Sequence, residues 1–329
     1  MRVKPIEINW HPDLPIFAKE SFLKAVSDQY GWLGGFSESD ELRCVLPYTI
    51  VRKAIFRMVR FRVETIPMVK GFDVAEEKTF LDGVIGYFRS MGADMVIPAT
   101  TNTIFRTYPA GAIAAPYGTY IIDLNQPEGV LWGNLNATYR KKIRNSIKNG
   151  VKIRTGTEYL ETAHEIIRDT LKKSSLGFMS YESLRRLVLG LKENVKIFVA
   201  DYQGTIQGCT IFPFSNYGAY SLYGGRTPQS ETGAMNLLNW EAIRQFRELG
   251  INRFDFMGVR INPEPGSKQE GIMTFKQRFG GKPVSGYMWK YSLHLLKFRV
   301  YCLAVRLSRG GDIVDAERQK LKSFSPVDK

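Results

Sequence analysis

The segment Tyr220–Arg226, in the second half of the chain, has residue types suited to binding an anion. It reads Tyr-Ser-Leu-Tyr-Gly-Gly-Arg, which predicts a strand that runs into a glycine turn, with a helix beginning at Gly233 shortly afterwards. The first turn of a helix presents free backbone amides and a partial positive charge to an anion. Gly224, Gly225 and Arg226 are therefore candidate substrate-binding residues.

Two side chains on predicted strands could hold or move a proton. Asp255 lies between Phe254 and Phe256, and strand alternation places it on the face opposite to both. It is a candidate general base, but pairing with a neighbouring arginine is the favoured interpretation because buried carboxylates usually have partners. Tyr223 could donate a proton to a leaving group, and the alternative is that it packs, as strand tyrosines commonly do.

A basic helix predicted over residues 136–149 is another candidate anion site. The four-residue spacing of Arg140 and Arg144 puts both cations on one helix face, with Lys141 beside them. These three residues could bind phosphates of a nucleotide-linked or lipid-linked acceptor. A basic helix face that is merely solvated explains the pattern equally well.

The chain has little that suits a metal site or a disulfide framework. Its three cysteines are isolated and odd in number, which favours a reducing compartment: Cys44, Cys209 and Cys302. Its three histidines are far apart and lack the spacing of metal ligands: His11, His164 and His294. We predict no catalytic metal and no tightly bound cofactor.

The composition is that of a folded protein with excess positive charge. The chain has 329 residues, of which 44% are hydrophobic and 24% charged, and this length suits two ordinary domains. Its net charge of +14 favours anionic partners such as nucleic acid, nucleotide-linked sugars, coenzyme A or anionic lipid. The polar N-terminus and the lack of a long apolar stretch predict a cytoplasmic location.

Hydrophobic periodicity and turn residues predict the elements that position these residues. Helices are predicted over residues 14–29, 76–90, 136–149, 158–173, 181–192, 234–249 and 287–309. Strands are predicted over residues 42–50, 57–65, 94–98, 119–124, 151–154, 195–202, 207–214, 219–224 and 253–257. Residues 100–118 are expected to form a surface loop.

Two pairs of short segments indicate an internal duplication. Phe88–Asp94 is echoed by Phe246–Asn252, and Cys44–Tyr48 by Cys209–Phe214, in the same order. A repeated unit of this size changes the fold prediction, so we interpret the chain as two similar α/β units. The predicted domains are residues 1–135 and 136–310, followed by a polar tail over residues 311–329.

A motif near the end of the second unit carries a family resemblance. Gly271–Gly281 fits the pattern Gly-Ile-x-x-Phe-Lys-x-x-Phe-Gly-Gly. With three upstream segments it resembles the FemABX peptidyltransferases in order and spacing over residues 130–290; these segments are Leu135–Val151, Trp240–Ile243 and Arg253–Gly258. The first half resembles the family only in general pattern. The resemblance implies two tandem GNAT-like domains, each a mixed, mainly antiparallel sheet flanked by helices (α/β, α+β).

The resemblance also implies acyl transfer to an amine. FemABX proteins move an aminoacyl group from transfer RNA to a peptidoglycan precursor, and relatives modify other glycans or small metabolites. Lys276 matches the lysine for which the family implies stabilisation of the carbonyl oxyanion; the alternative is a surface lysine over an exposed strand. Phe275 and Phe279 would shape the pocket, and Arg278 would bind substrate.

Two alternatives to an aminoacyltransferase stay open. The first is an acyl-coenzyme A-dependent N-acetyltransferase of an amino sugar or metabolite, although Gln229–Ala234 lacks the spacing of the GNAT pyrophosphate loop. The second is a non-catalytic RNA-binding protein, suggested by charge alone. The helices at 158–173 and 181–192 are too short for the long helical arm of several family members, so an aminoacyl-transfer RNA donor would bind without it.

The predicted helix at residues 287–309 is apolar and basic. Such a helix can lie on an anionic membrane surface, and this would suit a lipid-linked acceptor. The favoured alternative is that it packs on the second domain with its basic residues in water. The acceptor could equally be a glycan or a nucleotide sugar, and the sequence does not indicate an oligomeric state.

Overall fold

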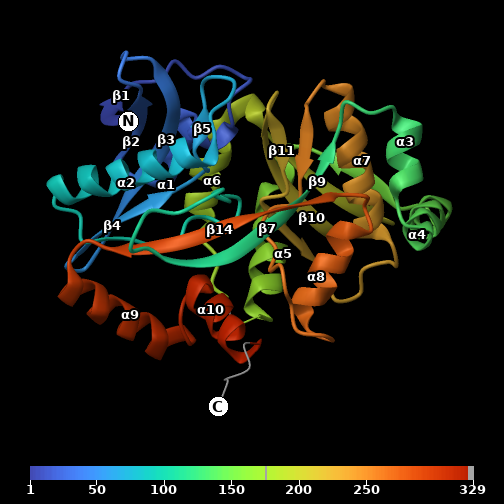
Figure 1. Cartoon of the computed structure of the whole chain (residues 1–329). Helices are drawn as coiled ribbons and strands as arrows, with labels where there is room; N and C mark the ends of the chain where they lie inside the picture. The colour runs from blue at the N-terminus through green and yellow to red at the C-terminus, as the bar shows by residue number, and fades with distance from the viewer. Residues whose placement is uncertain (175, 325–329) are drawn as a thin grey trace.

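Strand pairing joins both halves of the chain into one continuous sheet (Figure 1). The computed structural model describes residues 1–174 and 176–324. The strands lie in the order β1-β2-β3-β4-β6-β14-β7-β13-β11-β10-β9-β8, while β12 pairs with β10 and β5 with β3. The parallel pairs are β4 with β6 and β11 with β13, and the other pairs are antiparallel. The predicted class, a mixed and mainly antiparallel α/β arrangement, is confirmed.

The two halves repeat one order of elements. In each, an antiparallel hairpin is followed by a helix and then by a strand parallel to the second hairpin strand: β3-β4-α2-β6 and β10-β11-α7-β13. The first half contains β1 (Arg2–Ile6), α1 (Glu20–Val26), β2 (Tyr30–Phe36), β3 (Leu42–Lys53), β4 (Phe56–Phe61), β5 (Ile66–Pro67), α2 (Val74–Ser90) and β6 (Met95–Val96). The expected helix at 14–29 is thus shorter, with a 3₁₀ turn (Ile16–Ala18) before α1.

The second half carries most of the candidate site residues. It contains α3 (Glu128–Asn134), α4 (Ala137–Lys148), β8 (Lys152–Thr155), α5 (Leu160–Lys172), α6 (Tyr181–Leu191), β9 (Val195–Tyr202), β10 (Thr205–Ser215), β11 (Gly218–Tyr220), β12 (Tyr223–Arg226), α7 (Ala234–Glu248), β13 (Arg253–Asp255) and α8 (Lys268–Gln277). Helices α5 and α6 are 13 and 11 residues long, too short for an extended helical arm.

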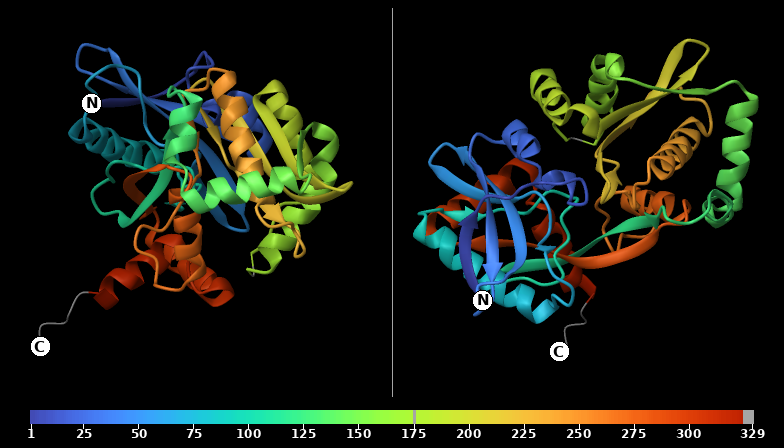
Figure 2. Two further views of the ribbon diagram at one scale, coloured as in Figure 1. Left: turned by 90° about the vertical axis from the view of Figure 1, so that its right-hand side faces the viewer. Right: turned by 90° about the horizontal axis from the view of Figure 1, so that it is seen from above.

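Two long strands connect the halves. β7 (Ile113–Asp123) and β14 (Lys282–Ser292) pair along nine residues, and Figure 2 shows this ribbon running between the halves. At one end β14 pairs with β6, and at the other β7 pairs with β13. Two expectations are therefore wrong: residues 113–118 are strand rather than loop, and residues 287–292 are strand rather than helix. The domain boundary at residue 135 stays a prediction.

A buried core is also shared between the halves. Phe22 and Leu23 of α1 belong to the same cluster as Leu184 and Leu187 of α6. All four side chains are at most 5% exposed. Because α1 comes from the first half and α6 from the second, burial of this apolar surface holds the halves in one arrangement.

The C-terminal helices pack on the β7–β14 side of the molecule (Figure 1). In α9 (Leu295–Arg309), Phe298 packs against Met58 and Met95 of the first half, not on the second domain as expected. The segment predicted as a polar tail contains a helix, α10 (Ile313–Phe324). Residues 325–329 of that prediction lie outside the described residues. In the part of the chain that the structure describes, no helix has the length and apolar character needed to cross a bilayer.

Candidate active site

Strands β11 and β13 separate in the middle of the second half. They pair in parallel only at Ala219–Phe254 and Tyr220–Asp255. Beyond this point β12 follows β10, whereas the chain after Asp255 follows β7. We call the space between the diverging chains the strand opening. The strand expected over residues 219–224 is therefore two strands, and Tyr223 begins the second of them on one side of the opening.

Lys276 lies on the other side of the strand opening, held by α8. The Ser267 hydroxyl accepts a hydrogen bond from the Glu270 amide and caps this helix, so the chain can turn into α8 after the loop. Lys276 is 8% exposed, and its Nζ donates to the carbonyl oxygens of Met257 and Gly258, both at 2.7 Å. The alternative of a surface lysine over an exposed strand is wrong, because the residue is buried and helical.

Burial also changes the charge state of Lys276. It lowers the pKa of the Lys276 ammonium from its usual 10.5 to about 8, and the nearby Asp255 carboxylate opposes this shift. A lysine ammonium has three N–H donors, and the neutral amine has two. Two donors are engaged by backbone carbonyls, so the third exists only while the group is charged.

Asp255 fixes the backbone beside Lys276. Its Oδ1 accepts a hydrogen bond from the Met257 amide at 2.7 Å and lies 2.6 Å from the Thr119 hydroxyl. That hydroxyl also lies 2.9 Å from the Met257 carbonyl oxygen and can donate to one of the two. Met257 has a φ of 62°, a left-handed conformation that costs free energy in a side-chain-bearing residue. Asp255, Thr119 and Lys276 together stabilise this turn.

The prediction that Asp255 pairs with a neighbouring arginine is wrong as regards hydrogen bonds. Its partners are a hydroxyl and an amide, while Arg253 acts on it only through its charge. Burial raises the pKa of Asp255 above its usual value, and the Thr119 hydrogen bond opposes the shift. Phe254 and Phe256 lie in the core on the α7 side of the sheet, so the predicted facing of Asp255 is consistent with the structure. Its role as a general base stays a prediction.

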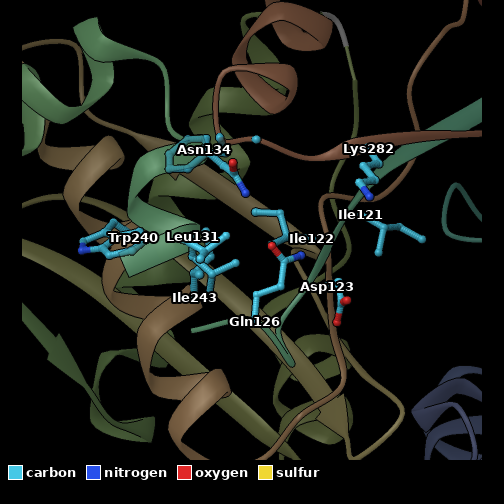
Figure 3. Close-up of a pocket in the computed structure, with 12 residues that line it drawn as sticks. Ile121, Ile122, Asp123, Gln126, Leu131, Asn134, Trp240, Ile243 and Lys282 are labelled. Atoms are coloured by element: carbon cyan, nitrogen blue, oxygen red, sulfur yellow. The ribbon is translucent and has the colours of Figure 1, made fainter. Parts of the chain in front are cut away.

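The two motif phenylalanines join α8 to α4. Phe279 is 1% exposed, and its ring lies 5.2 Å from the Tyr139 ring and 5.1 Å from the Phe275 ring, between centroids. Phe279 also lines a cavity of about 310 Å³ between α3, α7 and β14, with Trp240 and Lys282 (Figure 3). This cavity opens on the α7 side of the sheet. Phe275 and Phe279 thus pack α8 in place and so position Lys276.

The predicted basic residues are spread over different contacts. Arg140 donates to the carbonyl oxygens of Gly133 and Leu135, both at 2.7 Å, and thereby caps the end of α3. Arg144 lies 5.5 Å from the Trp132 ring centroid, on the same face of α4. Lys141 and Arg278 are exposed, and Arg278 lies 5.9 Å from the Tyr139 ring centroid.

The glycine pair lies within β12 rather than in a turn. A Cβ on Gly225 would lie 2.8 Å from both the Ile166 carbonyl oxygen and the Thr170 hydroxyl, so this glycine lets α5 pack on the strand. Gly224 is exposed beside it. Arg226 is exposed and lines a cleft of about 500 Å³ with Lys172 and Lys173. Arg226 therefore remains a candidate for binding an anion, whereas Gly225 serves packing.

Helix α4 covers the N-terminus of α7, which the sequence predicts as an anion site. A Cβ on Gly233 would lie 2.7 Å from both the Lys142 carbonyl oxygen and the Ser146 hydroxyl. Ser146 donates to the Thr232 carbonyl oxygen at 3.0 Å. In the loop before α7, the Glu231 carboxylate accepts a hydrogen bond from Asn149 Nδ2 at 2.7 Å. A helix backbone and a carboxylate thus occupy the approach to this helix end.

Two parts of the site were missed by sequence reasoning. Thr119 contacts Asp255 across 136 positions of the chain, and no local pattern connects them. Arg60 and Arg62, at the end of β4, lie near Tyr223. The sequence does contain a signal for these two arginines. They alternate with apolar residues in a strand that must be largely buried, and arginine is unusual in such a strand.

Comparisons with known proteins bear on one segment of the sequence and on the fold. Residues 134–277 match the family model described as an acetyltransferase (GNAT) domain. The crystal structure of FemX has a TM-score of 0.66 at 12% identity, over 90% of this chain and 99% of that one. A C-terminal domain of a putative lysylphosphatidylglycerol synthetase from Agrobacterium fabrum has a TM-score of 0.51 at 14% identity, over 85% and 90%. No curated protein matches the chain in sequence.

The matched segment is thus similar to a GNAT acetyltransferase domain, and this supports the predicted acyltransferase. Over 90% of its length the chain is similar in fold to FemX, so the predicted resemblance to FemABX proteins is confirmed. GNAT acetyltransferases take their acyl group from coenzyme A. Among the described residues, no group of three or more histidines, cysteines and carboxylates could hold a metal ion.

Proposed function

We propose that the chain forms an amide bond by transferring an acyl group, in the first instance an aminoacyl group, to an amine of a cell-envelope or glycan precursor. The amine attacks the ester or thioester carbonyl, the C–N bond forms, and the C–O or C–S bond breaks. The amine proton leaves with the departing hydroxyl or thiol. The observation that carries the proposal is the buried Lys276 ammonium at the strand opening, with two donors engaged and one left.

Lys276 would act on the carbonyl oxygen as negative charge builds on it. A preorganised donor in a partly dry site is worth about a hundred- to thousand-fold in rate. Its two bonds to Met257 and Gly258 fix the direction of the third donor, so little reorganisation is needed during the reaction. Tyr223, which is half-buried on the other side of the opening, is the candidate proton donor for the leaving group, and burial keeps its pKa raised.

Aminoacyl-transfer RNA is the proposed donor, and acyl-coenzyme A is the alternative. The packing of α4 on Gly233 and the position of Glu231 disfavour a diphosphate at the α7 N-terminus. The net charge of +14 and the cleft formed by Arg226, Lys172 and Lys173 suit a larger polyanion. The likeness of the fold to FemX supports the same choice.

The acceptor is proposed to be a lipid-linked precursor reached from the cytoplasmic side, with a soluble glycan or nucleotide sugar as alternatives. Helix α9 supports this choice because one of its faces is apolar and exposed. The residues of this face are at least 55% exposed: Leu296, Val300, Leu303 and Leu307. Peripheral membrane contact is therefore proposed for α9, within the predicted 287–309 segment, rather than for the strand residues 287–292.

Transfer can be tested with purified protein and two donors. Charged transfer RNA and acetyl-coenzyme A would each be mixed with a lipid-linked peptidoglycan precursor, a nucleotide-linked precursor or glucosamine, and the amide product measured by mass spectrometry. We expect product from charged transfer RNA, and a loss of about a hundredfold or more in Lys276→Ala. Lys268→Ala, which removes an exposed lysine from the same helix, is the matched control and should retain activity.

Other outcomes would replace the proposal. Product from acetyl-coenzyme A alone would make the chain an ordinary sugar or metabolite acetyltransferase. Binding of RNA with steep salt dependence, no product, and no effect of Lys276→Ala would favour the non-catalytic RNA-binding alternative.

A further inference from the structure

The cavity between α3, α7 and β14 has no part in the proposed transfer reaction. Its volume is about 310 Å³, and small-molecule sites begin at about this size. Neither Lys276 nor Tyr223 lines it. A molecule bound in this cavity would therefore be separate from the reacting groups at the strand opening.

One end of the cavity is apolar. Five side chains form it, each at most 5% exposed: Ile122, Leu131, Trp240, Ile243 and Phe279. Figure 3 shows Trp240, Leu131 and Ile243 gathered on one side. An apolar group placed against them would be removed from water, which favours its binding.

The other end carries two opposite charges that do not pair with each other. Figure 3 shows Asp123 and Lys282 on the side away from the apolar groups, with Gln126 and Asn134 between. Oδ1 of Asp123 accepts two hydrogen bonds from Asn125, both at 3.0 Å. Its Oδ2 and the Lys282 ammonium have no partner among the described residues. Both side chains are exposed, so this end is the mouth of the cavity.

The wall formed by α3 is held in place at both ends. Just before the helix, the Gln126 carbonyl oxygen accepts a hydrogen bond from Arg247 Nε of α7 at 2.7 Å. Just after it, the Asn136 amide donates to the Arg278 carbonyl oxygen at 2.9 Å. The cavity is thus formed without a ligand, so little ordering of the protein opposes binding.

A ligand that matches both ends has an apolar group next to an ammonium and a carboxylate. The ammonium suits Oδ2 of Asp123, and the carboxylate suits the Lys282 ammonium. A phosphorylated ligand would bring negative charge against Asp123, and a wholly apolar one would leave the mouth unpaired. An α-amino acid with an apolar side chain carries all three groups on one carbon atom.

We propose that this cavity binds a free α-amino acid with an apolar side chain. Lys282 would hold its carboxylate and Asp123 its ammonium, while its side chain contacts Trp240 and Ile243. This site is distinct from the strand opening that holds Lys276. Binding of the amino acid does not depend on the proposed transfer reaction.

The site can be tested by calorimetric titration and thermal unfolding of the full-length protein. L-Leucine and L-phenylalanine serve as probes, and we expect at least one to bind and to raise the melting temperature. The amide of that amino acid lacks the carboxylate, and its N-acetyl derivative lacks the ammonium. Each derivative should bind about tenfold more weakly or worse, because it loses one charge-assisted hydrogen bond.

Two variants test which residue holds which group. Lys282→Met and Asp123→Asn should each weaken binding of the amino acid about tenfold or more. Lys282→Met should also remove the preference for the amino acid over its amide, and Asp123→Asn the preference over the N-acetyl derivative. Lys152→Met, which removes an exposed lysine of β8 outside the cavity, is the control and should bind as the wild type does.

The outcomes separate this site from the proposed function. No binding of either amino acid, equal binding of the amino acid and both derivatives, or an equal loss in Lys152→Met overturns the site. Lys276→Ala should bind the amino acid normally, and a loss there would place the ligand in the strand opening instead. A chain that binds the amino acid but makes no amide contradicts the proposed function alone.

Discussion

At the scale of the residue, the charge of Lys276 should set an upper pH limit for transfer. With a pKa of about 8, the group is an ammonium with three donors below that pH and an amine with two above it. Both remaining donors are engaged by Met257 and Gly258. We therefore expect kcat/KM to fall about tenfold for each pH unit above the pKa of Lys276. A pH–rate profile of the wild type and of Lys276→Arg, which stays charged, measures this.

Loss of activity above pH 8 can be separated from unfolding. Because the folded-state pKa of Lys276 is lower than the usual 10.5, folding favours its deprotonated form. Lys276 therefore adds to the free energy of unfolding as the pH rises from about 8 to 10.5. This contribution is lost again as the pH falls through 8. Activity should fall where this contribution to stability rises. The same fall in Lys276→Arg would show that another group sets the limit.

Residue types could be predicted more fully than their contacts. Lys276 and Asp255 were identified from one motif and one strand pattern. Their partners were not, because Thr119 is 136 positions from Asp255, and the acceptors of Lys276 are backbone oxygens on a turn. A backbone carbonyl has no sequence signature, so the bonds that orient Lys276 appear only once the chain is folded.

At the scale of the element, β14 shows why some secondary structure was mistaken. The adjacent residues Met288 and Trp289 are 1% and 2% exposed, so this part of the strand is covered on both faces, whereas residues 282–285 are exposed. A strand buried on both faces has a continuous apolar run rather than alternation, and such a run joined to α9 resembles one long helix. The helices and strands of β8 to α7, by contrast, have caps, glycine ends and clear periodicity, and their predicted order is correct.

The packing of α10 on β14 leads to a prediction about stability. Lys290 is 1% exposed, and its Nζ contacts Asp312 at 2.8 Å and Asp315 at 2.6 Å, at the start of α10. Lys290→Met would leave Asp312 buried without its counter-charge, which typically costs about 3–5 kcal/mol. We expect urea denaturation to show a loss of this size. Lys282→Met, on the exposed end of β14, should change the midpoint little, and an equal loss there would contradict the argument.

At the scale of the whole molecule, two exposed apolar sites from distant parts of the chain lie near each other. Leu296, Val300, Leu303 and Leu307 recur at helical spacing along α9. Ile55, in the turn between β3 and β4, is 68% exposed, and the adjacent Phe56 ring lies 5.9 Å from the Tyr301 ring of α9. The exposed Lys53, Arg299 and Arg306 accompany them. This combination of apolar and basic side chains is typical of a surface that contacts an anionic membrane.

This surface should bind vesicles through apolar insertion as well as charge. We expect the protein to sediment with vesicles of phosphatidylglycerol and phosphatidylcholine, less with phosphatidylcholine alone, and less at high salt. The double variant Leu303→Glu/Leu307→Glu should bind at least tenfold more weakly, because it replaces apolar contacts by like charges facing anionic lipid. Leu249→Glu adds a carboxylate at a 50%-exposed leucine beyond the end of α7 and is the control. If it reduces binding as much per added charge, the net charge of +14 is sufficient to explain vesicle binding, and α9 has no special part in it. A larger loss in the α9 variant would instead show that α9 and the turn between β3 and β4 lie against the membrane.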